Sequence, residues 1–174
     1  MTTYNLVSRI NHWLFAILFM GMLGYGFYLA YGGLELPQKL PLIGTHKSIG
    51  VVVLLLALWR VGYRILQGFA KPVADMPKAQ EIASKVSHII LLAGIIAVPV
   101  SGLVLALYSG FPTDVFGLFT IPAIDKVDWL VGAARSAYKI AAYLVTITLV
   151  LHVAAALKHH LIDQDRALIR MICG

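Results

Sequence analysis

Histidines are the residues of this chain best suited to chemistry. The six are His12, His46, His88, His152, His159 and His160. His152 has the most informative setting, because apolar residues flank it on both sides from Leu149 to Leu157. A neutral imidazole in such surroundings is costly unless it has a partner. Haem iron is one such partner, and a hydrogen bond to a carbonyl or to a neighbouring helix is the other.

A second histidine lies at a matching depth on another apolar segment. His152 lies five residues before Leu157, or about 7.5 Å at the helical rise. His12 lies about one turn inside the first apolar segment, from the same side. Two such imidazoles favour a b-type haem with His12 and His152 as axial ligands. His88 lies near the same depth, so spacing alone leaves open which two of the three meet.

The elements that carry these histidines follow from composition. Of the 174 residues, 60% are hydrophobic and only 13% are charged, about half the usual charged fraction. The apolar residues gather into four blocks, each long enough to cross a hydrocarbon layer of about 30 Å as a helix. We predict an all-α, integral membrane four-helix bundle with haem between helices, and one domain over residues 1–174. The expected helices cover roughly residues 10–30, 49–66, 89–107 and 137–157.

Basic residues predict the orientation of the bundle. With both termini on one side, that side receives nine of the fourteen Lys and Arg residues: Arg9, Arg60, Arg64, Lys71, Lys78, Lys85, Lys158, Arg166 and Arg170. The positive-inside rule then places both termini in the cytoplasm. The net charge of +6 indicates topology and lipid contact and not nucleic-acid binding. The single cysteine, Cys173, excludes a disulfide framework and a cysteine-ligated cluster.

Short motifs surround the histidines. Residues 8–14 read Ser-Arg-Ile-Asn-His-Trp-Leu, residues 45–50 read Thr-His-Lys-Ser-Ile-Gly, and residues 151–160 read Leu-His-Val-Ala-Ala-Ala-Leu-Lys-His-His. These segments resemble the bacterial cytochrome b561 family, small four-helix di-haem proteins of the inner membrane, and the resemblance covers nearly the whole chain. It implies a cytoplasmic-side haem held by His12 and His152. It also implies an outer haem held by the second and fourth helices, with His46 as the second-helix ligand.

The outer haem shows one departure from the family pattern. The family's second helix-four ligand precedes the first by fourteen residues, which is within about 40° of four whole helical turns. That position holds Tyr138. Tyr138 as a phenolate ligand, another ligand such as Lys139, or an outer haem that is five-coordinate or absent all remain open. Of these, we expect an outer haem held by His46 with Tyr138 facing it.

The resemblance implies electron transfer between a donor and the membrane quinone pool, with superoxide oxidation and ubiquinone reduction as one possible activity. Four side chains near the cytoplasmic haem are candidates for a quinone site: Arg9, Lys158, His159 and His160. Arg60 and Arg64 are candidates to pair with haem propionates, or they serve as topology anchors. Two alternatives remain: a haem-bearing membrane subunit that serves a partner dehydrogenase, and a non-redox membrane subunit with structural histidines.

Overall fold

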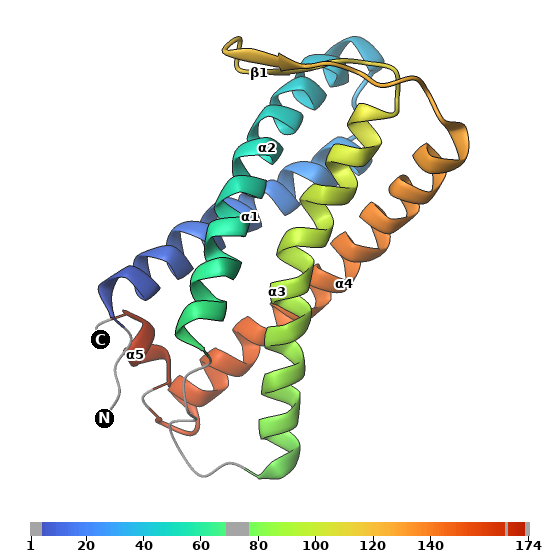
Figure 1. Cartoon of the computed structure of the whole chain (residues 1–174). Helices are drawn as coiled ribbons and strands as arrows, with labels where there is room; N and C mark the ends of the chain where they lie inside the picture. Colours follow the sequence, from blue (N-terminus) through green and yellow to red (C-terminus); the bar gives the residue numbers. More distant parts are fainter. Residues whose placement is uncertain (1–4, 69–76, 166, 173–174) are drawn as a thin grey trace.

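The computed structural model describes residues 5–68, 77–165 and 167–172. Four long helices dominate it (Figure 1): α1 (Leu6–Tyr31), α2 (Leu36–Gln67), α3 (Lys78–Leu107) and α4 (Asp128–Leu161). Each is long and apolar enough to cross a membrane, which confirms the predicted all-α membrane bundle. Lys71, Arg166 and Cys173 lie outside the described residues.

The helices extend beyond the predicted apolar blocks. The second was expected over residues 49–66, but α2 begins at Leu36, so His46 lies well inside the helix. Hydropathy marks only the part of a helix that faces hydrocarbon, whereas capping groups mark where the helix begins. Here the Glu35 amide donates a hydrogen bond to Gln38 Oε1 at 3.2 Å. The helix α2 therefore begins at this cap, thirteen residues before the predicted apolar block.

The sequence predicts no strand between α3 and α4, but the structure has two short strands there. The strands β1 (Thr113–Val115) and β2 (Phe119–Ile121) form an antiparallel hairpin. It packs on α2, where Ser48 Oγ donates a hydrogen bond to the Asp114 carbonyl at 2.7 Å. Strands of three residues are too short to show a clear alternating pattern in sequence.

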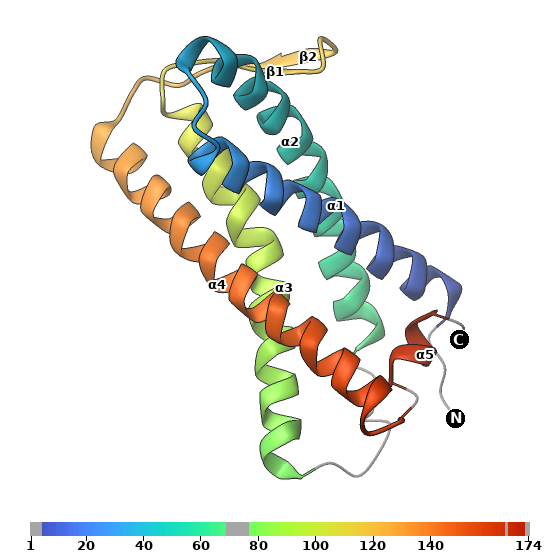
Figure 2. The same ribbon diagram turned by 180° about the vertical axis from the view of Figure 1, so that it is seen from behind.

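A short helix, α5 (Ala167–Ile172), lies at the opposite end of the bundle, near both chain termini (Figure 2). The Trp13 indole N–H donates to the Met171 carbonyl at 2.9 Å, which ties α5 to the start of α1. We call this end, with the N-terminal part of α1 and the C-terminal part of α4, the terminal end. The end that carries β1 and β2 is the hairpin end.

A buried apolar cluster fills the middle of the bundle. It comprises Phe15, Phe19, Val53, Ala57, Ile95, Val98 and Val145. Val145 of α4 is only 1% exposed, and it lies seven residues from both Tyr138 and His152. The cluster therefore separates the level of Tyr138 from the level of His152.

Close packing of α3 against α4 depends on one glycine. A Cβ added at Gly94 would overlap the Val145 side chain. The β-branched Val145 cannot swing aside easily, because one χ1 rotamer dominates for valine in a helix. Gly94 is therefore required for the observed approach of these two helices.

We expect Gly94→Ala to destabilise the bundle by about 1–3 kcal/mol, the usual effect of overpacking. The measurement is thermal unfolding of the purified protein in detergent. Gly21→Ala is the control, because a Cβ at Gly21 meets nothing within 4 Å. Adding Val145→Ala to Gly94→Ala should give a loss smaller than the sum of the two single losses. Equal melting temperatures for Gly94→Ala and Gly21→Ala would contradict this account of the packing.

Candidate haem sites

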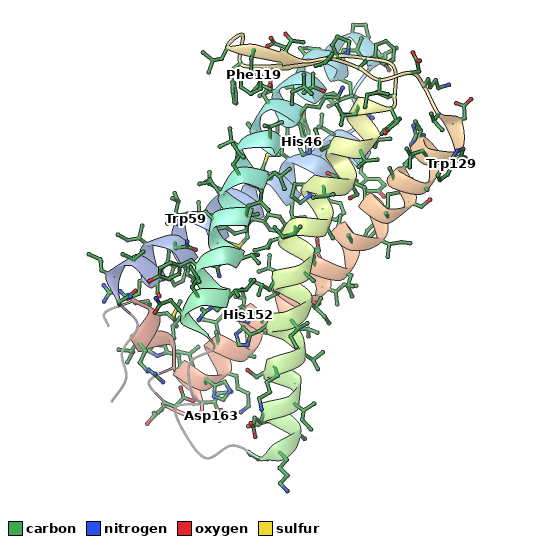
Figure 3. The ribbon with its side chains drawn as sticks, viewed as in Figure 1. His46, Trp59, Phe119, Trp129, His152 and Asp163 are labelled. Carbon is green, nitrogen blue, oxygen red and sulfur yellow. The ribbon has the colours of Figure 1, made fainter. Side chains whose placement is uncertain are left out.

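At the terminal end, each long helix contributes a basic side chain to one level of the bundle. These are His12 of α1, Arg60 of α2, His88 of α3 and His152 of α4. The His88 and His152 rings meet edge to face, with centroids 5.4 Å apart and an interplanar angle of 74°. His12 lies within electrostatic reach of both. Figure 3 labels His152 in this part of the bundle. The three histidines expected at one depth are thus brought together.

The Arg60 guanidinium hydrogen-bonds to both His12 and Asn11. Its Nη2 donates to His12 Nδ1 at 2.9 Å, and its Nη1 donates to Asn11 Oδ1 at 3.0 Å. A guanidinium only donates hydrogen bonds, so His12 Nδ1 accepts and the ring proton of the neutral imidazole lies on Nε2. The Arg60 guanidinium also lies 5.6 Å from the Phe15 ring centroid. This arrangement holds a cation inside the bundle.

Asn11 is a site residue to which sequence analysis gave no role. Its side chain is only 2% exposed, and its Nδ2 donor has no partner among the described residues. It borders a polar cavity of about 10 Å³, lined by Ser8, Asn11, Arg60, Tyr63 and Arg64. A buried donor without an acceptor is costly, so the pocket favours an anionic oxygen. The sequence does contain one indication of this role, since Asn11 is an amide inside an apolar segment and lies next to His12.

The ends of α4 and of the chain form a separate polar cluster. Lys158 Nζ donates to both carboxylate oxygens of Asp163, at 2.9 and 2.6 Å, and this ammonium group lowers the pKa of Asp163. His159 Nδ1 lies 2.7 Å from an Asp165 oxygen and 3.2 Å from an Asp163 oxygen. The acids that follow α4 therefore hold two of the predicted quinone-site residues. His160 is exposed.

The fourth predicted quinone-site residue lies on another helix. Arg9 is half-buried in the first turn of α1. Its Nε is buried and has no partner among the described residues. An unpartnered guanidinium N–H suits an anion or a carbonyl oxygen.

At the hairpin end, His46 and Tyr138 face one another. His46 Nε2 lies 3.3 Å from the Tyr138 hydroxyl oxygen. The Tyr25 ring meets the His46 ring edge to face at 5.3 Å, and the Tyr25 hydroxyl donates to the Leu42 carbonyl at 2.9 Å. Tyr25 therefore positions the imidazole while it anchors α1 to α2. The sequence pattern around Tyr25 does not indicate this role, because the role arises only from contact between helices.

Two glycines border the His46–Tyr138 pair. A Cβ at Gly26 of α1 would lie 3.4 Å from the Tyr138 hydroxyl and 3.5 Å from His46 Cε1. A Cβ at Gly102 of α3 would lie 3.3 Å from the Tyr138 ring. The Tyr138 side chain therefore packs directly against both glycines, and the His46 ring packs against Gly26. All four long helices thus contribute to this level as well.

The two levels offer different donor sets for haem iron. The terminal end offers three imidazoles from different helices, together with a small cavity lined by hydrogen-bond donors. The hairpin end offers one imidazole and one phenol. Both sets contain ligands that haem proteins use. Haem at either level would supply reversible one-electron redox chemistry.

We expect Arg60→Gln to weaken haem binding at the terminal end. Truncating one partner of a buried charge pair costs about 2–5 kcal/mol, which here would appear as faster haem loss to a haem scavenger. The measurement is the rate of haem transfer from the purified protein to that scavenger. Arg135→Gln, which replaces an exposed arginine of α4, is the control. Equal haem loss from both variants would remove Arg60 from the site.

Comparison with known proteins identifies the family of this chain. Residues 3–174 match the family described as prokaryotic cytochrome b561. The chain is 30% identical over 174 residues to cytochrome b561 homolog 2 of Escherichia coli K12, an alignment that covers 97% of this chain and 90% of that protein. It is 27% identical over 128 residues to cytochrome b561 homolog 1 of the same organism, covering 74% and 73% of the two chains. The chain belongs to the prokaryotic cytochrome b561 family of multi-pass membrane b-type cytochromes.

Proposed function

We propose that this protein passes electrons between a donor and the membrane quinone pool through a haem held at the terminal end by His12 and His152. The observation that carries the proposal is that His12 of α1 lies within electrostatic reach of His152 of α4, next to Asn11 and its donor-lined cavity. Two imidazoles saturate the iron, which suits electron transfer over substrate binding at the metal. The proposed orientation, with both termini cytoplasmic in a bacterial inner membrane, rests on the distribution of basic residues.

His88 has a different proposed role from His12 and His152. Its ring packs edge to face against His152, and its Nδ1 lies 3.5 Å from Ser84 Oγ. The His88 residue is exposed overall, whereas His12 and His152 are half-buried. His88 therefore serves as a positioning residue for the His152 ring, consistent with the family resemblance, which assigns the ligands to the first and fourth helices.

Arg60 and Asn11 hold the propionates in this proposal. Binding iron through His12 Nε2 requires the ring proton to lie on Nδ1, so Arg60 must release Nδ1. A propionate carboxylate in the Asn11 pocket would offer Arg60 a better partner, since a charge-assisted hydrogen bond is roughly twice as strong as a neutral one. It would also accept from Asn11 Nδ2, the donor that otherwise lacks a partner. Arg64, which lines the same pocket, adds positive charge.

The quinone site lies at the end of α4 in our proposal. Lys158, His159, His160 and Arg9 supply the hydrogen-bond donors at the level where a quinone headgroup would arrive from lipid. Asp163 and Asp165 orient Lys158 and His159. Ubiquinone is the candidate acceptor and superoxide is a candidate one-electron donor, drawn to the basic residues of the hairpin end, Lys39, Lys47, Arg135 and Lys139.

Replacing His152 or His12 by alanine should remove the bis-histidine signal, because the iron loses an axial ligand. The measurement is the haem-to-protein ratio by pyridine haemochrome, together with the reduced-minus-oxidised spectrum. His160→Ala is the control for loss of an imidazole near the same end. An unchanged spectrum in both ligand variants would exclude this pair. If the signal is lost in His88→Ala and in only one of His12→Ala and His152→Ala, then His88 and that one residue are the ligands.

We expect His159→Gln to slow quinone reduction by about 10²–10⁴-fold, the usual contribution of a positioned proton donor. The measurement is reoxidation of the pre-reduced protein by a ubiquinone analogue, with haem content checked in the same sample. Lys85→Gln is the control, because Lys85 is another basic residue of this end, in an exposed ion pair with Glu81. If the wild-type protein reacts with no quinone but accepts electrons from a copurifying dehydrogenase, the partner-subunit function is correct.

A further inference from the structure

The β1–β2 hairpin covers a part of α2 that points away from the bundle core. Ser48 of α2 is buried, and its Oγ donates to the Asp114 carbonyl of β1 at 2.7 Å. Ala57, which is fully buried in the core, follows Ser48 by nine residues, or about two and a half helical turns. The two residues therefore lie on opposite faces of α2, and the hairpin packs on the outer face.

The same outer face of α2 continues as an exposed apolar stripe. Val52, Leu55 and Trp59 follow Ser48 at four, seven and eleven residues, which places all of them on one side of the helix. All three are exposed. Because α2 is apolar enough to cross a membrane, this stripe faces lipid. The hairpin therefore lies at the start of the apolar stretch of α2, on the side where the helix meets the bilayer.

The two faces of the hairpin differ in polarity. Val115 pairs with Phe119, and Asp114 pairs with Thr120. Directly opposed residues lie on one face of a ladder and successive residues alternate, so these two pairs lie on opposite faces. Val115 is buried on β1, the strand that packs on α2. Phe119 shares that face but is 54% exposed, so the apolar face extends beyond the protein.

The hairpin also extends beyond the bundle in space. Both ribbon views show it passing α2 on the side away from α4 (Figures 1 and 2), and Figure 3 labels Phe119 on this part of it. The apolar face of the hairpin therefore lies over the surroundings of α2 and not over the centre of the bundle.

The turn of the hairpin carries an aromatic residue in an unfavourable backbone conformation. The Leu118 amide donates to the Val115 carbonyl at 3.0 Å, and the two residues between them, Phe116 and Gly117, have φ values of 54° and 71°. Such turns favour Asn-Gly, and a bulky side chain in the left-handed region is strained. Phe116 is exposed, and Leu118 is 82% exposed. The tip thus presents large apolar side chains at a cost in backbone strain.

Charge is nearly absent from this segment. From Phe111 to Ile121 the sequence contains one charged residue, Asp114. Its carboxylate accepts a hydrogen bond from the Gly117 amide at 2.8 Å, within the hairpin itself. Exposed strands in water usually carry charged side chains that prevent association. An exposed apolar surface without them is typical of a contact with a membrane or a protein.

We propose that the β1–β2 hairpin is an interfacial lipid anchor, whose apolar side chains Phe116, Leu118 and Phe119 enter the boundary between headgroups and acyl chains beside α2. A bilayer is the favoured partner, because this surface continues the lipid-facing stripe of α2. The hairpin backbone stays at the headgroup level, since an open strand edge is not tolerated in hydrocarbon. The inference rests on the membrane location of the four helices and not on the proposed electron transfer.

The test measures the depth of spin labels on the purified full-length chain in vesicles of phosphatidylethanolamine and phosphatidylglycerol. The single cysteine is first removed by Cys173→Ser, and labels are then attached in Phe119→Cys or Thr120→Cys. These neighbours form a matched pair, because they lie on opposite faces of the hairpin. Leu55→Cys, on the exposed stripe of α2, is the reference for lipid. Depth is obtained from electron paramagnetic resonance saturation with oxygen, which concentrates in lipid, and with a water-soluble nickel chelate.

We expect the label of Phe119→Cys to lie roughly 5–10 Å below the headgroup surface, as for other interfacial amphipathic segments, and the label of Thr120→Cys to lie in water. Leu118→Cys should match Phe119→Cys, and it replaces that variant if circular dichroism shows that Phe119→Cys does not fold. Equal access of the nickel chelate to positions 119 and 120 would overturn the proposal. Dipolar broadening at position 119 that disappears on dilution with unlabelled protein would also overturn it, because a second copy of the chain would then cover the hairpin.

Discussion

Polar side chains inside a hydrocarbon layer must find their partners within the protein, and this constraint organises the whole molecule. The guanidinium of Arg60 donates to the imidazole of His12 at 2.9 Å, and His46 Nε2 pairs with the Tyr138 hydroxyl at the other level. These contacts join α1 to α2 at the terminal end and α2 to α4 at the hairpin end.

Between the two heights the bundle is apolar and closely packed. Val145 is almost fully buried, and Gly94 lets α3 approach α4 at that point. Such packing resists deformation, since protein interiors pack about as densely as organic crystals. The core therefore acts as a rigid spacer that fixes how far apart the two polar levels lie. A spacing of this kind suits a chain that moves electrons across a membrane, because a redox group at each level would stay in a constant position.

The two levels are chemically unequal. The terminal end gathers three imidazoles with a pocket of cationic and amide donors. The hairpin end has one imidazole and one phenol, bordered by glycines.

The sequence by itself determined the membrane helices, the matched depth of His12 and His152, and the departure at position 138, because hydropathy and the helical repeat act locally along the chain. It did not determine the ends of the helices, which depend on capping contacts such as Glu35 with Gln38. It also gave no role to Asn11, Tyr25, Gly26 or Gly102, whose functions arise from neighbours on other helices. Only the tertiary structure decided that Tyr138 faces His46 and that His88 packs on His152, because rotation and tilt of helices are set by packing between them.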